Sequence, residues 1–336
     1  MSSLLGLFAR FSHSTLRTFQ PRVFSLTSQK RNKKAEPTKE LFSIEDLPPS
    51  ASKFLEEDLE ALRVGFKPAL NENDVIPNLS GMNYIIQSIL LTNNTYNLNI
   101  VPVTNLPAKY NVPHISRETL EKAKFDVGGF QCISDPKVRT FFDKLHDAVF
   151  NGLQVVGTDE TFTDTLVDDL LRIAELNEWP LKIRNHPPCK LYIGDQHHFS
   201  AIPEFLVRRH DHTIIGVVDK HLKNVWPISG FGESQIAVEI LACSSENMRL
   251  RDFKYTEQTI FAVRVISTYV TFYKTVIPVI YWKELEKGLP KKQSIEIQRW
   301  PADNSLRSGF DLAEPDGRRT VLNSLFKISR FLAPRV

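Results

Sequence analysis

The sequence predicts an α/β protein of the mixed α+β kind, with a central mixed sheet flanked by helices. From residue 158 onward, segments whose apolar residues recur at helical spacing alternate with short runs of β-branched residues. Their order is helix, three strands, helix, two strands, helix. Of the 336 residues, 42% are apolar and 24% are charged, which permits a sizeable core and excludes a wholly disordered chain.

The first 34 residues differ in charge from the rest of the chain. They hold no acidic residue and seven basic ones: Arg10, Arg17, Arg22, Lys30, Arg31, Lys33 and Lys34. Removing these seven from the 42 basic residues leaves 35 against 39 acidic residues, so the remainder has a charge of about −4. A basic, acid-free and serine-rich start is typical of a mitochondrial presequence. We therefore predict a transit peptide over 1–34 and a matrix location; the alternative is a basic arm that contacts nucleic acid.

A linker and a helical region are expected next. Residues 35–50 are polar and contain two adjacent prolines near their end, which favours a linker. Apolar spacing and the helix-starting pair Asp135-Pro136 predict helices at 52–64, 80–91 and 135–150. We therefore expect a helical accessory region over 51–150 and the main domain over 151–336.

The main domain opens with a helix over 158–177, whose apolar stripe includes Leu166 and Leu170. Three strands follow, and the polar turns between them indicate hairpins. These strands are expected at 190–193, 200–208 and 213–220. The remaining elements are a helix at 233–243, strands at 258–268 and 269–277, and helices at 281–288 and 320–332.

The apolar run over 259–282 is long enough to cross a bilayer. Arg264 and Lys274 would then lie in the hydrocarbon, and the run is dense in β-branched and aromatic residues. Two buried strands therefore explain this run better than a membrane span does.

The three cysteines, Cys132, Cys189 and Cys243, lie far apart in the sequence and form no CxxC pair. This excludes a disulfide scaffold and a cysteine-rich zinc module, and it suits a reducing compartment. Cys243 is expected in the core. The glycine-containing turns lack the spacing and the lysine of a phosphate loop, so no nucleotide cofactor is predicted.

Polar residues that could carry chemistry gather at the ends of two expected strands. Glu204 follows Pro203 in the second strand, and Asp219 and Lys220 end its hairpin partner. The helix at 233–243 then brings Gln235 and Glu239. Because residues two apart on a strand share a face, an acid of this strand could hold Mg²⁺ together with Glu204. The lysine could orient or deprotonate the attacking water.

Over roughly residues 158–280, this order of elements resembles the PD-(D/E)xK nuclease-like superfamily, whose core is helix, three strands, helix, strand. The tract Gly232-Glu233-Ser234-Gln235 is similar to its fungal branch. The resemblance implies a restriction-endonuclease-like core and Mg²⁺-dependent hydrolysis of DNA. It implies catalytic roles for Glu204, Asp219, Lys220 and Gln235, with Glu204 and Asp219 as the metal ligands. A further acid from the first helix would be Asp169 or Glu175.

The superfamily has an acid two residues before its lysine. The corresponding acid-x-Lys tract of this chain, over 218–221, departs from that pattern and can be aligned in two registers. With Lys220 as the family lysine, the position of the acid holds Val218. With Asp219 as the acid, the position of the lysine holds His221. The first register loses a metal ligand and the second loses the lysine. The sequence therefore predicts a weak hydrolase or an inactive nuclease-like module. The alternative is a non-catalytic nucleic-acid-binding or assembly protein that uses this fold as a scaffold.

Cations expected along one edge of this site make DNA the expected partner, because a phosphodiester needs its charge neutralised. They are Arg208, Arg209, Lys220, Lys223, Arg249, Arg251 and Lys254. Trp226 and Phe231 could stack on bases.

Overall fold

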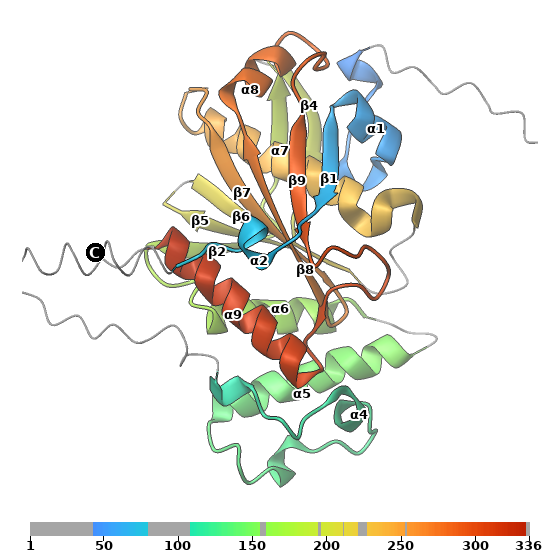
Figure 1. Cartoon of the computed structure of the whole chain (residues 1–336), viewed down its shortest axis with the longest axis vertical. Helices are drawn as coiled ribbons and strands as arrows, with labels where there is room; N and C mark the ends of the chain where they lie inside the picture. Colours follow the sequence, from blue (N-terminus) through green and yellow to red (C-terminus); the bar gives the residue numbers. More distant parts are fainter. Residues whose placement is uncertain are drawn as a thin grey trace, which may run out of the picture. The chain divides into compact units, whose positions relative to one another are not determined.

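The computed structural model describes residues 43–79, 108–154, 159–193, 196–210, 212–220, 227–252 and 254–333 (Figure 1). Only the backbone is described at 108, 212–214 and 218–220. The predicted transit peptide at 1–34 and the predicted helix at 80–91 lie outside the described residues, as do His221, Lys223 and Trp226.

A mixed sheet of eight strands forms the centre of the described part of the chain. The strands lie in the order β1 (Val64–Pro68), β9 (Ile295–Trp300), β8 (Tyr269–Ile277), β7 (Gln258–Ile266), β6 (His212–Lys220), β5 (Phe205–Arg209) and β2 (Leu181–Asn185), and β10 (Phe310–Asp311) pairs with β8. The pairs β1–β9 and β6–β7 are parallel and the others are antiparallel. A separate hairpin is formed by β3 (Cys189–Ile193) and β4 (Gln196–Ala201).

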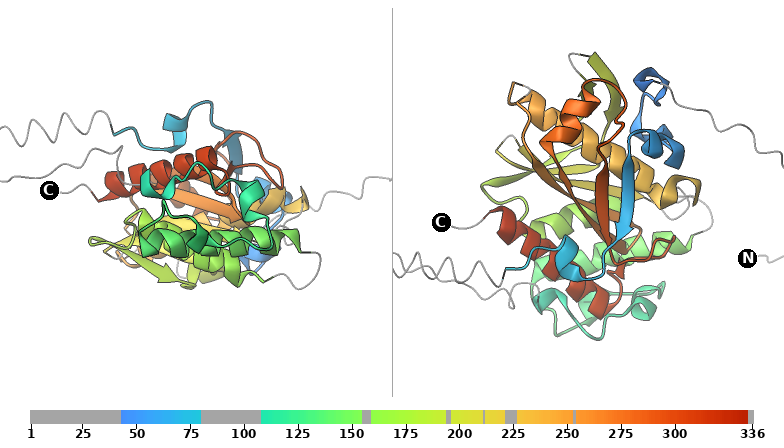
Figure 2. Two further views of the ribbon diagram at one scale, coloured as in Figure 1. Left: turned by 90° about the horizontal axis from the view of Figure 1, so that it is seen from below. Right: turned by 45° about the horizontal axis from the view of Figure 1, so that its top comes forward.

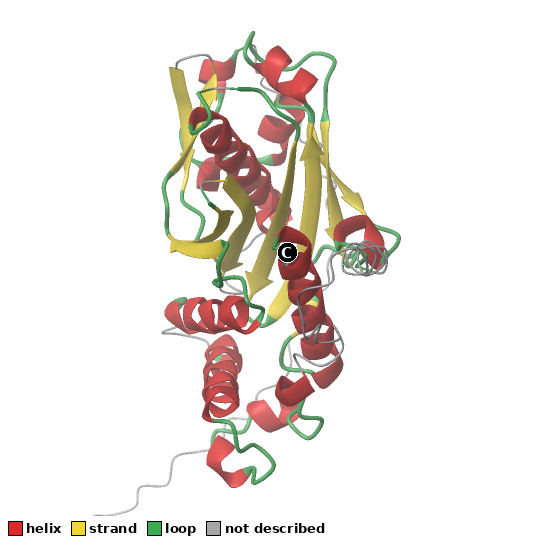
Figure 3. Cartoon of the chain, turned by 90° about the vertical axis from the view of Figure 1, so that its left-hand side faces the viewer, coloured by secondary structure: helices red, strands yellow, loops and turns green. Residues whose placement is uncertain are grey.

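Helices cover both faces of this sheet, so the predicted α/β class with a central mixed sheet is confirmed (Figures 2 and 3). The helices are α1 (Glu56–Ala61), α2 (Glu72–Val75), α4 (Arg117–Leu120), α5 (Pro136–Leu153), α6 (Thr161–Ile173), α7 (Glu233–Arg249), α8 (Val279–Leu285) and α9 (Pro315–Leu332). A 3-10 segment over Pro227–Gly232 leads into α7. Among the described residues, no helix has the length and apolarity that crossing a bilayer requires.

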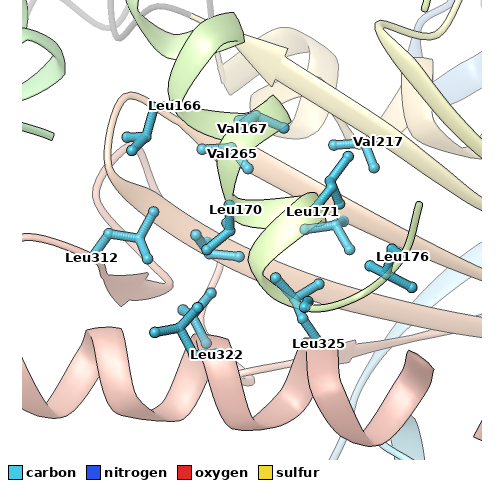
Figure 4. Close-up of a cluster of buried hydrophobic side chains, with 14 of the residues drawn as sticks. Leu166, Val167, Leu170, Leu171, Leu176, Val217, Val265, Leu312, Leu322 and Leu325 are labelled. Atoms are coloured by element: carbon cyan, nitrogen blue, oxygen red, sulfur yellow. The ribbon is translucent and has the colours of Figure 1, made fainter. Parts of the chain in front are cut away.

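Two apolar cores lie on the two faces of the sheet. One core joins α5, α6 and α9 to alternate residues of the central strands, among them Val217 and Val265 (Figure 4). The other joins α7, α8 and the β3–β4 hairpin to the remaining residues of those strands, among them Leu206 and Ala262. Because β7 and β8 are largely buried on both faces, their sequence is mostly apolar instead of alternating, and the two predicted strands are confirmed.

The strands before β6 differ from the expected ones. The strand expected at 200–208 is two strands, because Pro203 has no N–H to donate between β4 and β5. The strand that pairs with β5 in the central sheet is β2, which the sequence analysis did not identify, while the expected strand at 190–193 belongs to the separate hairpin. The region over 51–150 also contributes a strand, because β1 pairs with β9.

Candidate functional site

The candidate site lies where β5 begins, β6 ends and α7 begins. In the antiparallel pair, Phe205 lies opposite Val217 and Leu206 opposite Gly216. Extending this register by one residue places Glu204, which directly precedes β5, opposite position 218. The structure therefore brings the backbone of Glu204 close to that of the acid-x-Lys tract.

Alternation along the strands assigns these positions to faces of the sheet. Leu206 packs in the core that contains α7, and Gly216 lines a small pocket against α7. Val217 packs in the opposite core, with α6 and α9 (Figure 4). Because successive strand residues alternate between the two faces of the sheet, Glu204 and positions 218 and 220 belong to the α7 face, and position 219 belongs to the opposite face. This geometry favours the register that keeps Lys220 and has Val218 in place of the acid.

Glu204 and position 218 form a row across neighbouring strands on the α7 face, and the buried Arg264 of β7 continues this row. Position 218 of β6 pairs with Arg264 of β7, whose side chain is 1% exposed. The Arg264 guanidinium donates to the Phe231 carbonyl at 2.8 Å and to Asn304 Oδ1 at 3.0 Å. It also donates to Thr271 Oγ1 and lies 5.7 Å from the ring centre of Tyr273. These hydrogen-bond partners are all neutral, and the Glu233 carboxylate interacts with the guanidinium electrostatically, so a buried cation is fixed beside position 218.

The glutamate of the Gly232–Gln235 tract forms a buried ion pair. Glu233 Oε1 accepts a hydrogen bond from Arg299 at 2.7 Å, and Arg299 also donates to the Ala302 carbonyl. Burial raises the pKa of the Glu233 carboxyl, and the charge of Arg299 opposes this effect. The pair connects the first residue of α7 to β9, so Glu233 positions the helix that carries Gln235.

Gln235 and Glu239 form a second polar pair one turn further along α7. Gln235 Nε2 donates to Glu239 Oε1 at 2.7 Å, and Glu239 is 2% exposed. Glu239 lines the same small pocket as Gly216 and Cys243. The spacing of four residues on a helix could have predicted this pair.

The acids expected from the first helix are engaged elsewhere. Asp169 of α6 pairs with Lys144 of α5 at 2.9 Å, and Glu175 pairs with Arg330 of α9 at 2.8 Å. Both pairs link helices that pack on the face opposite α7, so neither acid joins the candidate site.

The cations expected along one edge are divided between the two ends of the sheet. Arg208 and Arg209 pair with Thr213 and His212 at the start of β6, whereas Lys220 ends that strand. Arg249 at the end of α7 pairs with Glu246. Nine strand residues span roughly 25 Å or more, so one phosphate cannot contact both groups.

A basic edge, defined as Lys182, Arg184, Arg208 and Arg209, lies on the outer strand pair. Lys182 of β2 lies directly opposite Arg208 of β5, and Arg184 and Arg209 are exposed. Trp179, which precedes β2, is 87% exposed. An exposed aromatic ring beside several cations is the combination that single-stranded nucleic acids require.

Comparison with known proteins adds no relative. No family model and no curated protein matches the chain. In the described residues, no group of three or more His, Cys, Asp or Glu side chains is placed to hold a metal ion. The fold and contacts define a mixed α/β protein with a polar site between α7 and strands β5 to β7. Its function must therefore follow from the chemistry of these residues.

Proposed function

We propose that this chain is a mitochondrial, nuclease-like protein that binds nucleic acid without Mg²⁺-dependent cleavage. The order α6, β2, β5, β6, α7, β7 supports a nuclease-like core, because it repeats the helix, three strands, helix, strand order of that superfamily. The hairpin β3–β4 is then an insertion between the first and second core strands. Targeting by residues 1–34 remains a prediction from the sequence.

The row formed by Glu204, Val218 and Arg264 carries the proposal. Mg²⁺ in proteins takes oxygen ligands and needs one or two carboxylates in near-octahedral geometry. In this row Glu204 offers a carboxylate, valine offers no oxygen, and the third place holds a guanidinium. Neighbouring strands lie about 4.8 Å apart. The residues of this row therefore do not fit a magnesium ion.

Electrostatics gives the size of this effect. Charges of +1 and +2 about 6 Å apart repel by roughly 5 kcal/mol at an effective dielectric constant of about 20, and the carboxylates of Glu204 and Glu233 offset part of this repulsion. Arg264 cannot turn away, because it is buried and hydrogen-bonded to three neighbours. We infer that Arg264 replaces the charge that a metal would bring and stabilises the site without it.

The basic edge supports nucleic acid as the partner. Lys182 and Arg184 belong to one face at the margin of the sheet, where backbone phosphates can reach them, and Arg208 of the same face interacts with Cys189. Trp179 lies near the end of the same strand pair and offers a stacking surface. Arg208 and Arg209 lie at the opposite end of β5 from Glu204, whereas Arg184 lies opposite Leu206, two residues from Glu204.

The test is the binding of a fluorescent single-stranded oligonucleotide to the full chain at several salt concentrations. The variant is the double substitution Lys182→Glu/Arg184→Glu, which keeps β2 paired because a glutamate at 182 would face Arg208. We expect at least tenfold weaker binding and a salt slope smaller by about 1.4, which corresponds to two lost phosphate contacts on a single strand. The matched control, Lys283→Glu/Lys287→Glu near α8, should bind as the wild type does. Equal affinity of the two double variants would contradict the assignment of the surface.

A further inference from the structure

Two cysteines that are 54 residues apart in sequence meet in the interior. Cys189 is the first residue of β3, and Cys243 lies in the middle of α7. Their sulfur atoms are 3.6 Å apart, and the side chains are 0% and 1% exposed. A disulfide bond has a length of about 2.05 Å, so the sulfurs need to approach by only about 1.5 Å.

The two thiols differ in acidity. The hydrogen bond from Cys243 and the positive charge of Arg208 lower the pKa of Cys189, although burial opposes them. The pKa of Cys243 is raised by its contact with Cys189 and by burial. The charged groups facing the pair are Arg208, Glu239 and Glu246. Cys189 is therefore the better nucleophile, and Cys243 is placed to react with it afterwards.

A small pocket between the sheet and α7 borders one thiol of this pair, that of Cys243. It is lined by Gly216 and Ala262 of the sheet and by Glu239 and Cys243 of α7, with isoleucine side chains around them. The missing side chain at Gly216 keeps the space open, because a Cβ there would meet only Leu206 at 3.8 Å. Cys189 does not line this pocket and is fully buried, so peroxide reaches Cys189 only through local opening of the contact between β3 and α7.

We propose that Cys189 and Cys243 form a redox modification site, a dithiol that hydrogen peroxide oxidises to a disulfide joining β3 to α7. The Cys189 thiolate attacks one peroxide oxygen, the O–O bond breaks, and hydroxide leaves. Cys243 sulfur then attacks the resulting sulfenic acid, the S–S bond forms, and the S–O bond breaks as water departs. In total, two thiols lose two protons and two electrons, and one peroxide becomes two water molecules.

The disulfide would act on the candidate site through α7. Cys243 follows Glu239 by one helical turn, and Glu239 accepts a hydrogen bond from Gln235. The hairpin already contacts the helix, because Tyr192 N donates to Ser245 Oγ at 2.9 Å. Oxidation therefore fixes α7 to β3 next to the pocket that Glu239 lines. This site does not depend on the nucleic-acid proposal.

The experiment uses the full chain carrying Cys132→Ser, which leaves Cys189 and Cys243 as its two cysteines. After treatment with peroxide, unfolding and alkylation, mass spectrometry should show the loss of two hydrogen atoms and one cross-linked peptide containing both residues. The melting temperature should rise by roughly 5 °C or more, because the bond closes a long loop in the unfolded chain. Dithiothreitol should reverse both changes.

Two single variants test the order of the steps. In the same background, Cys243→Ser should accumulate sulfenic acid at Cys189, which a dimedone probe detects. Cys189→Ser should react at least tenfold more slowly. Alkylation of both cysteines in the peroxide-treated parent, without any cross-linked peptide, would overturn the proposal. Because the parent is measured directly, this result does not depend on how well the variants fold.

Discussion

Glu233 and Arg299 carry opposite charges at a place that water scarcely reaches, with side chains 8% and 10% exposed. Arg318 is another buried charge, and it donates only to backbone carbonyls in the part of the chain that the structure describes. Burial lowers the pKa of Arg318 to about 10. The sequence could not identify these residues, because the partners of Glu233 and Arg318 lie as many as 66 and 208 positions away.

Glu233→Gln should destabilise the protein by roughly 3 kcal/mol, because it leaves the buried charge of Arg299 without a counter-charge. The matched control is Glu296→Gln. Glu296 lies on β9, as Arg299 does, and forms an exposed ion pair with Lys67 of β1, so its substitution should lower the free energy of unfolding by less than about 1 kcal/mol. Urea unfolding of the full chain measures both values. Equal losses in the two variants would show that burial of the Glu233 pair has no energetic consequence.

The candidate site could be predicted only in part from the sequence. The adjacency of Glu204 to the acid-x-Lys tract was predicted from the hairpin between the second and third expected strands, whereas the first strand of the central group, β2, was not identified. The choice between the two registers of the tract depends on which residues of β6 face α7, and only packing shows that. Arg264 was interpreted as a charge within an apolar run, and its place beside position 218 follows from the pairing of β6 with β7.

At the scale of elements, short contacts fix how helices join strands. The Glu284 carboxylate of α8 accepts hydrogen bonds from the backbone N–H groups of Lys291, Lys292 and Gln293 at 3.1, 2.9 and 2.7 Å. These bonds lower the pKa of Glu284. They hold the turn that leads from α8 into β9, much as a helix cap satisfies free N–H groups.

The pH dependence of stability tests this turn. Because the folded pKa of Glu284 lies below the unfolded value of about 4.3, its stabilisation is present above that pH and is lost as pH falls through the folded pKa. The stability difference between wild type and Glu284→Gln should therefore shrink as pH falls from about 5 to 3. Urea unfolding at each pH measures it. Glu257→Gln, an exposed glutamate before β7, is the control, and an unchanged Glu284 difference at low pH would exclude this role.

Gly317 shows why α9 can lie so close to β10. A Cβ atom at this position would clash with the backbone of Asp311. Gly317→Ala should therefore cost roughly 2 kcal/mol or more, although alanine favours a helix. Gly65→Ala in β1, where a Cβ meets nothing within 4 Å, should change stability by less than about 0.5 kcal/mol. Thermal unfolding compares the two variants. A Gly317→Ala variant as stable as the wild type would mean that α9 can move away from β10 without cost.

Elements with strong local signals were predicted and edge elements were not. Asp135 caps α5 through the N–H of Lys137, as the Asp-Pro pair indicated. Strand β2 was missed because its five residues, Leu181–Asn185, include two cations and an asparagine, and half of its surface faces solvent. Such a strand is stabilised by pairing with β5, and this pairing leaves no signal in the local sequence.

At the scale of the whole described chain, one sheet separates two cores, and the two proposals lie on the same side of it. Glu204, Arg264, Gln235 and the cysteine pair all belong to the α7 face. The opposite face holds α5, α6 and α9 on an apolar surface (Figure 4).

The measurement that tests the central claim most directly is plasmid cleavage by the full chain with millimolar Mg²⁺, compared with Glu204→Ala. Because Val218 stands where the second acid of the site would be needed and the fixed guanidinium of Arg264 lies beside it, we predict no nicking or linearisation by either protein. Cleavage by the wild type that is lost in Glu204→Ala would contradict the account, since Glu204 would then hold a working metal beside Arg264.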